Sequence, residues 1–134
     1  MDTLLLQLGI TLFLLGLLTG FVVPALKNPR MGLSSHLEGV LNGIFLVALG
    51  LLWPRLNLSA AWLTAAFWLA LYGTFANWFA TLLAAVWGAG AMMPIAAQGH
   101  QATAGRENVI RLLLGTLSLA MVAVCVIVIV GLRG

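Results

Sequence analysis

Four long runs of apolar residues divide this chain of 134 residues, and they restrict the folds that it can adopt. A transmembrane helix needs about 20 predominantly apolar residues to cross the hydrocarbon core. The runs predict helices at about residues 4–26, 36–53, 60–92 and 108–132. Short polar segments join them, so the sequence predicts an all-α membrane protein. We expect a single domain over residues 1–134, folded as a bundle of four transmembrane helices.

The composition supports a lipid environment. Hydrophobic residues make up 63% of the chain and charged residues only 7%, and the mean hydropathy is +1.13. A soluble domain carries about 25% charged residues, so this chain has too few to cover a surface in water. The few charges lie mainly at the ends of the apolar runs, which indicates anchoring at the membrane surface rather than binding of nucleic acid.

The basic residues also predict an orientation. Four of them lie on the side of the first and third loops: Lys27, Arg30, Arg106 and Arg111. Arg55 and Arg133 lie on the opposite side. Since cytoplasmic loops carry the excess of lysine and arginine, this pattern places both termini outside. The first run lacks a preceding basic segment, so we expect it to remain as a helix rather than to be cleaved.

The start of the second run contains three polar side chains, His36, Glu38 and Asn42. Ser35 and Glu38 fit the S-x-x-E pattern of a capping box, in which the glutamate binds a free backbone N–H of the first helical turn. This gives Glu38 a purely structural role. The other interpretation is functional, because ionisable groups inside a membrane are costly and mark sites of activity.

His36, Gly39 and Gly43 fall on one face of the second predicted helix at 100° per residue. An imidazole beside a groove of small residues suits a planar macrocycle whose iron the histidine ligates. The alternatives are an ordinary interfacial histidine and glycines that let two helices pack closely. His100 is a candidate second ligand, or simply a solvated loop residue.

The third run contains "LYGTFANWFATLL", in which polar and aromatic side chains recur at helical spacing. The polar stripe consists of Thr74, Asn77 and Thr81, and the aromatic stripe of Trp68, Tyr72, Phe75 and Phe79. Together with Asn42 and His36, this run predicts a small pocket that accepts an aromatic compound. Packing and hydrogen bonding between helices explain the same stripes without a ligand.

Several classes of enzyme have no support. The sequence has no serine–histidine–acid set, no phosphate-binding loop and no paired acids at useful spacing, so a hydrolase or kinase is not indicated. Cys125 is the single cysteine. It therefore forms no internal disulfide, and it is typical of a small packing residue.

Three segments make the chain resemble the hydroxylaminobenzene mutases. They are "GLLTGFVVPALKNPRMGLSSHLEGVLNGIFLVALGLLW", "LYGTFANWFATLLAAVWGAG" and "MMPIAAQGHQA". The resemblance extends over nearly the whole chain. It implies an isomerase of the bacterial inner membrane that converts hydroxylaminobenzene to 2-aminophenol during degradation of nitroarenes.

A more distant resemblance connects the chain to the styrene oxide isomerases. That family is a trimer with haem b held by one histidine, and its ferric iron acts as a Lewis acid. Its histidine is followed six residues later by an active-site asparagine, as His36 is followed here by Asn42. Its active-site aspartate has no counterpart in the spans of this chain, so Glu38 or Asn77 would take that place. Tyr72 is the only tyrosine available for the family's catalytic tyrosine.

The two resemblances together imply a homotrimer and a set of roles. His36 would be the axial ligand of ferric haem b, with Gly39 and Gly43 leaving space for the ring. Asn42 would bind the hydroxylamine, and Tyr72 and Asn77 would orient the substrate or the migrating hydroxyl. Phe75 and Trp78 are candidates for stacking on the substrate ring.

Two other functions remain open at this point. The first is a small proton-coupled exporter of aromatic or cationic compounds, in which Glu38 exchanges protons for substrate. The second is a haem-binding subunit for electron transfer, which usually requires two axial ligands.

Overall fold

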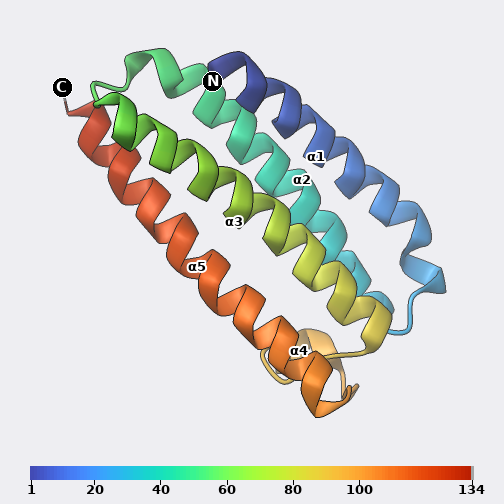
Figure 1. Cartoon of the computed structure of the whole chain (residues 1–134). Helices are drawn as coiled ribbons and strands as arrows, with labels where there is room; N and C mark the ends of the chain where they lie inside the picture. The colour runs from blue at the N-terminus through green and yellow to red at the C-terminus, as the bar shows by residue number, and fades with distance from the viewer. Residues whose placement is uncertain (134) are drawn as a thin grey trace.

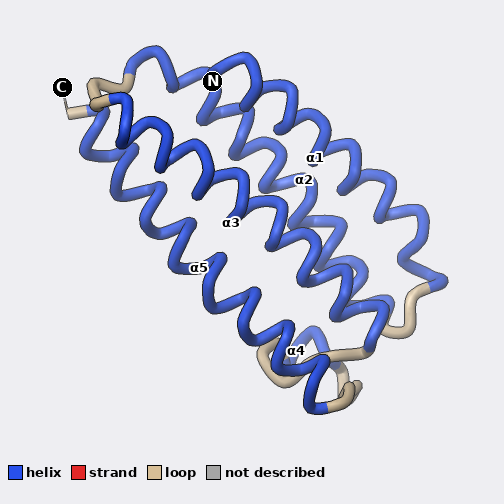
Figure 2. The backbone as a smooth tube through the Cα atoms, in the orientation of Figure 1, coloured by secondary structure: helices blue, strands red, loops and turns tan. Residues whose placement is uncertain are grey.

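The computed structural model describes residues 1–133, and all regular secondary structure in that range is helical (Figure 1). The helices are α1 (Asp2–Val22), α2 (Pro29–Leu52), α3 (Ala60–Trp87), the short α4 (Pro94–Ala97) and α5 (Ala104–Leu132). One turn of 3₁₀-helix extends α1 and another extends α2, at Val23–Ala25 and Trp53–Arg55. Figure 2 shows helices and connecting loops, with no strand among the described residues.

Four of these helices are long and apolar enough to cross a membrane, which confirms the predicted four spans. Consecutive long helices run in opposite directions (Figure 1). Both termini and the α2–α3 connection therefore lie at one end of the molecule. The α1–α2 connection and α4 lie at the other end.

The start of α2 differs from the prediction. The helix begins at Pro29, seven residues before the expected start, and its N-cap is Asn28. The Asn28 side chain accepts a hydrogen bond from the Met31 backbone N–H at 3.1 Å, and proline suits the first helical position because it lacks the N–H that would be unpaired there. The capping box at Ser35 and Glu38 was therefore wrong, and both residues lie inside the helix.

The predicted bounds of the third and fourth spans also change. α3 ends at Trp87 rather than near Met92, because Gly88 takes the left-handed conformation with φ 71° that commonly ends a helix. α5 begins at Ala104, four residues before the predicted start. Between them, α4 forms a single turn inside the segment that the sequence predicted as a loop.

The long helices are arranged as a row in the order α1, α2, α3, α5 (Figure 1). α1 packs mainly on α2, α2 also packs on α3, and α3 packs on α5. In the part of the chain that the structure describes, α5 makes no extensive contact with α1. The four-helix bundle of the prediction is thus open along one side, and α2 and α3 are its two central helices.

Glycines make the contact between α1 and α2 close. A Cβ atom added to Gly43 would lie 2.6 Å from the Phe13 nitrogen and 2.7 Å from the Gly9 oxygen. A Cβ atom on Gly39 would lie 2.5 Å from the Gly16 Cα. Only residues without a side chain permit this approach of two backbones, so the glycine faces serve helix packing.

Candidate active site

Three of the predicted site residues meet between α2 and α3. The Glu38 Oε2 atom accepts a hydrogen bond from Asn42 Nδ2 at 3.0 Å and another from Asn77 Nδ2 at 2.7 Å. The Asn42 amide also donates to the backbone oxygen of Glu38 at 2.9 Å. We call Glu38, Asn42 and Asn77 the carboxylate cluster. The sequence predicted all three residues, but it did not predict that they bind one another.

The depth of the cluster rules out the simple structural role for Glu38. Glu38 lies nine residues beyond the first residue of α2, which is about 14 Å along the helix axis at 1.5 Å per residue. It therefore binds no free N–H group of the first turn. A carboxyl group at this depth within an apolar span is a candidate for function.

The cluster also retains free acceptor atoms. The two amides share Oε2, and Glu38 Oε1 has no hydrogen-bond partner among residues 1–133. The same holds for the side-chain oxygens of Asn42 and Asn77. The described residues contain no fully buried side-chain nitrogen or oxygen without a partner, so these oxygens are accessible rather than sealed in the core. Three acceptors in one place suit a ligand that carries N–H and O–H donors.

His36 occupies another face of α2 and packs against α1. Its Nδ1 atom lies 2.8 Å from the carbonyl oxygen of Gly16. Because a carbonyl only accepts hydrogen bonds, Nδ1 carries the proton and Nε2 keeps its lone pair. A Cβ atom on Gly20 would lie 2.9 Å from His36 Nδ1, so the imidazole fills the space above that glycine.

This arrangement fits one part of the predicted haem site and conflicts with another. A histidine whose Nδ1–H binds a backbone carbonyl is oriented as metal-ligating histidines are, with Nε2 free to bind. The space beside Gly39 and Gly43, however, is filled by the backbone of α1. The expected room for a planar ring at these glycines is therefore absent in this chain, and the packing of α1 is the physical reason.

The histidine and the carboxylate cluster do not share one site within this chain. His36 and Asn42 are six residues apart, which places them about 120° apart around α2. His36 faces α1, whereas Asn42 is buried and binds Glu38, which in turn binds Asn77 of α3. No group of three or more metal-ligating side chains occurs within residues 1–133.

The predicted aromatic candidates have structural partners. The Tyr72 hydroxyl binds that of Thr116, on the side of α3 that faces α5. Trp78 donates from Nε1 to the Thr19 hydroxyl of α1 at 3.0 Å, and its ring edge lies against Gly39. Phe75 packs against the apolar core. None of the three contacts the carboxylate cluster through a hydrogen bond.

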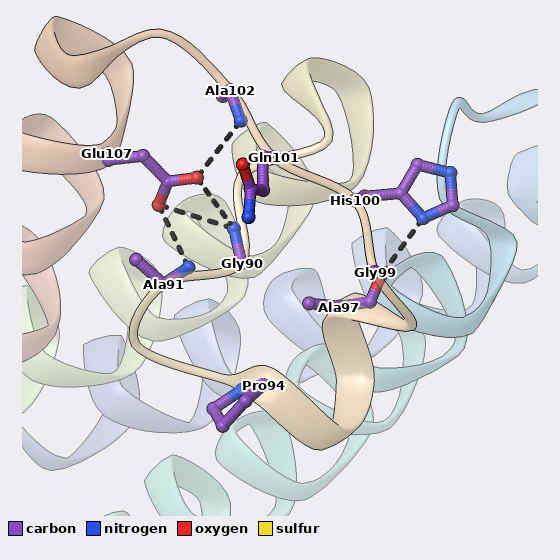
Figure 3. A pocket seen from close by; sticks show the side chains of 9 residues that line it. All are labelled: Gly90, Ala91, Pro94, Ala97, Gly99, His100, Gln101, Ala102 and Glu107. Atoms are coloured by element: carbon purple, nitrogen blue, oxygen red, sulfur yellow. Dashed lines mark hydrogen bonds between the residues drawn. The ribbon is translucent and has the colours of Figure 1, made fainter.

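A pocket of about 380 Å³ lies at the end of the molecule that contains α4 (Figure 3). The carboxylate of Glu107 accepts hydrogen bonds there from the backbone N–H groups of Gly90, Ala91 and Ala102, at 3.0–3.3 Å. Both of its oxygens have protein partners, unlike those of Glu38. Glu107 thus ties both ends of the α4 segment to α5, and the sequence analysis missed this role.

Asn28 is a second structural residue that the sequence analysis missed. It is fully buried, and its side-chain amide donates to the carbonyl oxygens of Ala96 and Ala97 at 2.9 and 3.1 Å. It therefore caps α2 and also holds α4 in place. The sequence signal was present, because an asparagine directly before a proline is a typical helix start.

His100 belongs to the same loop. Its Nδ1 atom binds the carbonyl oxygen of Ala97 at 2.9 Å, and Figure 3 shows its ring turned away from Glu107. This is the geometry of a loop residue. Among the described residues, the two histidines bind different backbone carbonyls, His36 that of Gly16 and His100 that of Ala97, and they do not hydrogen-bond each other.

Comparison with known proteins identifies the family. Residues 1–133 match the styrene oxide isomerase family. The chain belongs to that family. It is 64% identical to hydroxylaminobenzene mutase HabB of Ectopseudomonas oleovorans over 130 residues, covering 96% of this chain and 79% of the relative. It is 52% identical to hydroxylaminobenzene mutase HabA of the same organism over 133 residues, covering 98% of each chain.

These matches confirm both resemblances that the sequence suggested. No solved structure is significantly similar to the chain. The family membership covers nearly every residue, so the carboxylate cluster and His36 both lie within the matched region.

Proposed function

We propose that this protein is a hydroxylaminobenzene mutase, an isomerase that converts hydroxylaminobenzene to 2-aminophenol in the degradation of nitroarenes. The observation that carries the proposal is the carboxylate cluster, with a free carboxylate oxygen and two free amide oxygens inside an apolar span. The names of the two relatives support the choice of substrate. Hydroxylaminobenzene offers an N–H and an O–H donor to these three acceptors.

The reaction moves a hydroxyl group from nitrogen to the neighbouring ring carbon without net oxidation or reduction. The N–O bond breaks and a C–O bond forms at the ortho carbon, which leaves an imine and a ring carbon that still carries its hydrogen. That carbon then loses a proton, and the nitrogen gains one. Glu38 takes the proton from carbon and returns a proton to nitrogen, as a general base and then a general acid.

Asn42 and Asn77 set the position of Glu38. Their amides hold Oε2, so Oε1 is the atom presented to the substrate. Their own oxygens accept the N–H and O–H donors and fix the orientation of the hydroxylamine beside the ring. The apolar surroundings exclude water, which is the competing nucleophile in this rearrangement.

The haem of the more distant relatives enters as a separate part of the proposal. His36 would hold ferric haem b through Nε2, and iron bound there would supply Lewis-acid chemistry. Within one chain this position lies on a different face of α2 from the carboxylate cluster. The hydrogen bond from Nδ1 to the Gly16 carbonyl keeps the imidazole in the tautomer that such a ligand requires. Gly39 and Gly43 are not included, because α1 covers them.

We also propose that the protein is a homotrimer of the bacterial inner membrane. The four-helix row is open along one side, which leaves long helix faces for contact with further copies or with lipid. The trimer itself comes from the resemblance to the styrene oxide isomerases.

The test of the function uses two matched substitutions, Glu38→Gln and Glu107→Gln. Each removes one carboxylate from the detergent-purified protein with the same change of shape. We expect Glu38→Gln to lower kcat for formation of 2-aminophenol by about 10²–10⁴-fold, the usual contribution of a positioned acid–base group. Glu107→Gln should retain activity within a few-fold. Equal activity of the two variants would exclude Glu38 from the chemistry.

The haem is tested by absorption spectra before and after dithionite. A Soret band that shifts on reduction and is lost in His36→Ala supports the ligand. A featureless spectrum from protein that forms 2-aminophenol would exclude the haem from the mechanism, while the mutase function would remain supported. The exporter alternative, which also used Glu38, has no support from the relatives, because both are named mutases. An electron-transfer subunit would show a reducible band without isomerase activity.

A further inference from the structure

An apolar groove of about 230 Å³ lies between α2 and α5, toward the end of the molecule that contains both termini, and it shares no lining residue with the pocket beside α4. α3 separates the two helices along the row (Figure 1). The groove is lined from α2 by Phe45, Ala48, Leu49 and Leu52, and from α5 by Cys125, Val128 and Ile129. It presents one aromatic ring and no hydrogen-bonding side chain apart from the thiol.

The groove lies on the same stripe of α2 as the carboxylate cluster. Glu38, Asn42, Phe45 and Leu49 follow one another at spacings of four, three and four residues, which places them on one face of a helix. Phe45 lies three residues beyond Asn42, about 4.5 Å further along the helix axis. The polar cluster therefore ends where the groove begins.

α3 has the corresponding pattern. From Asn77, its stripe continues through Gly73, Ala70 and Ala66 at helical spacing. Ala66 and Ala70 are fully buried and belong to the same core as Leu49. The small side chains of this α3 stripe take up little space between α2 and α5, whose larger side chains line the groove.

We propose that the α2–α5 groove is the subsite for the aryl ring of the substrate, which enters it sideways from the lipid. The inference rests on the proposed function and names where the ring is bound. Hydroxylaminobenzene has one polar group and one apolar ring, and the stripe offers a polar cluster followed by an apolar groove in the same order. Phe45 supplies an aromatic face, which favours offset or edge-to-face packing with a second ring.

Cys125 provides a direct probe of this groove, because it is the single cysteine and it is exposed in the wall. We expect methyl methanethiosulfonate to modify Cys125 about ten times more slowly at a concentration of 2-aminophenol ten times its Kd, since only the ligand-free protein reacts. The control is Val122→Cys in a Cys125→Ser background. Val122 lies three residues earlier on α5, is 64% exposed and lines none of the described pockets, so its modification should be unaffected.

A second experiment fills the groove. Cys125→Phe should raise KM for hydroxylaminobenzene by about tenfold or more, with kcat within about twofold, because a pocket mismatch of one methylene already produces changes of this size. Val122→Phe adds comparable bulk on the lipid-facing side and should leave KM unchanged. If Cys125→Phe does not fold, the protection experiment on the unmodified protein decides the question.

The outcomes test the ring subsite separately from the proposed mutase function. If active protein is modified at Cys125 at the same rate with and without 2-aminophenol, the groove does not bind the ring and is left to a lipid chain or another copy. The proposed subsite would then be wrong, and the mutase function would remain supported. Protection by 2-aminophenol in protein without turnover would support the groove and overturn the mutase. Protection together with a KM effect confined to Cys125→Phe supports both.

Discussion

Gly43 offers a test of how α1 and α2 are held together. Replacing it with alanine adds one methyl group at a point where both neighbours are backbone atoms, the Phe13 nitrogen at 2.6 Å and the Gly9 oxygen at 2.7 Å. Neither neighbour can rotate away as a side chain can. Ordinary van der Waals contact begins at 3.4 Å, so the helices must separate locally by about 0.8 Å.

The expected loss of stability follows from that displacement. α1 packs mainly on α2, so a separation at Gly43 loosens most of the contact that holds α1. Adding a methyl group to a well-packed interface destabilises by about 1–3 kcal/mol. Gly115 is the matched control, because a Cβ atom there would meet nothing within 4 Å. Gly115→Ala should be neutral or stabilising by up to about 1 kcal/mol, from the gain in helix propensity.

The assay is unfolding in mixed micelles by titration with SDS, followed by tryptophan fluorescence. Gly43→Ala should unfold at a lower SDS fraction than the unmodified protein, and Gly115→Ala should not. If the two variants were equally stable, the close α1–α2 contact would be wrong. A Gly43→Ala variant that kept full stability but lost bound haem would instead support the predicted space for a macrocycle.

Four further substitutions have specific expected results. Asn28→Ala should destabilise the protein by about 2–4 kcal/mol in the same titration, because it removes the cap of α2 and the amide that donates to the Ala96 and Ala97 carbonyls of α4. Ser35→Ala removes one hydrogen bond and should cost only about 0.5–1.5 kcal/mol. A larger loss of stability in Ser35→Ala than in Asn28→Ala would favour Ser35 as the cap of the helix. Glu107→Gln should speed amide hydrogen exchange in the α4 loop, and unchanged exchange would show that the carboxylate does not hold the loop. Tyr72→Phe should change kcat by less than about twofold, since the hydroxyl binds α5 rather than the carboxylate cluster, and a large loss would return Tyr72 to the catalytic set.

The sequence was sufficient for the number and type of the helices because the bilayer imposes a length of about 20 apolar residues on each span. It was less reliable at the helix ends. The segment from Pro29 to Ser35 is polar and was assigned to a turn, although Asn28 and Pro29 form a typical helix start. An apolar run indicates which part of a helix lies in lipid. A helix can extend beyond the lipid at either end, so the run does not fix where the helix begins or ends.

The residues of the candidate site could be predicted from the sequence, but their contacts could not. Glu38, Asn42 and Asn77 were recognisable because amides and carboxyls are rare in apolar spans, and each needs a partner there. Their mutual binding depends on the register between α2 and α3, which no local pattern contains. The same limit explains Tyr72, which was assigned to the site from its type but faces α5.

α2 lies between α1 and α3 in the row, so its two faces have different partners, and adjacent residues should report this difference. Asn42 lies within the carboxylate cluster, which joins α2 to α3, whereas Gly43 touches α1. We expect Asn42→Ala to lower kcat by at least about tenfold while costing about 1 kcal/mol of stability, because its amide makes bonds only within the cluster. Gly43→Ala should instead lose about 1–3 kcal/mol of stability and keep its turnover per folded molecule. Parallel measurement of turnover and SDS unfolding on the two variants tests this separation, and a large loss of stability in Asn42→Ala with turnover per folded molecule preserved would show that the cluster holds the helices together rather than acting on substrate.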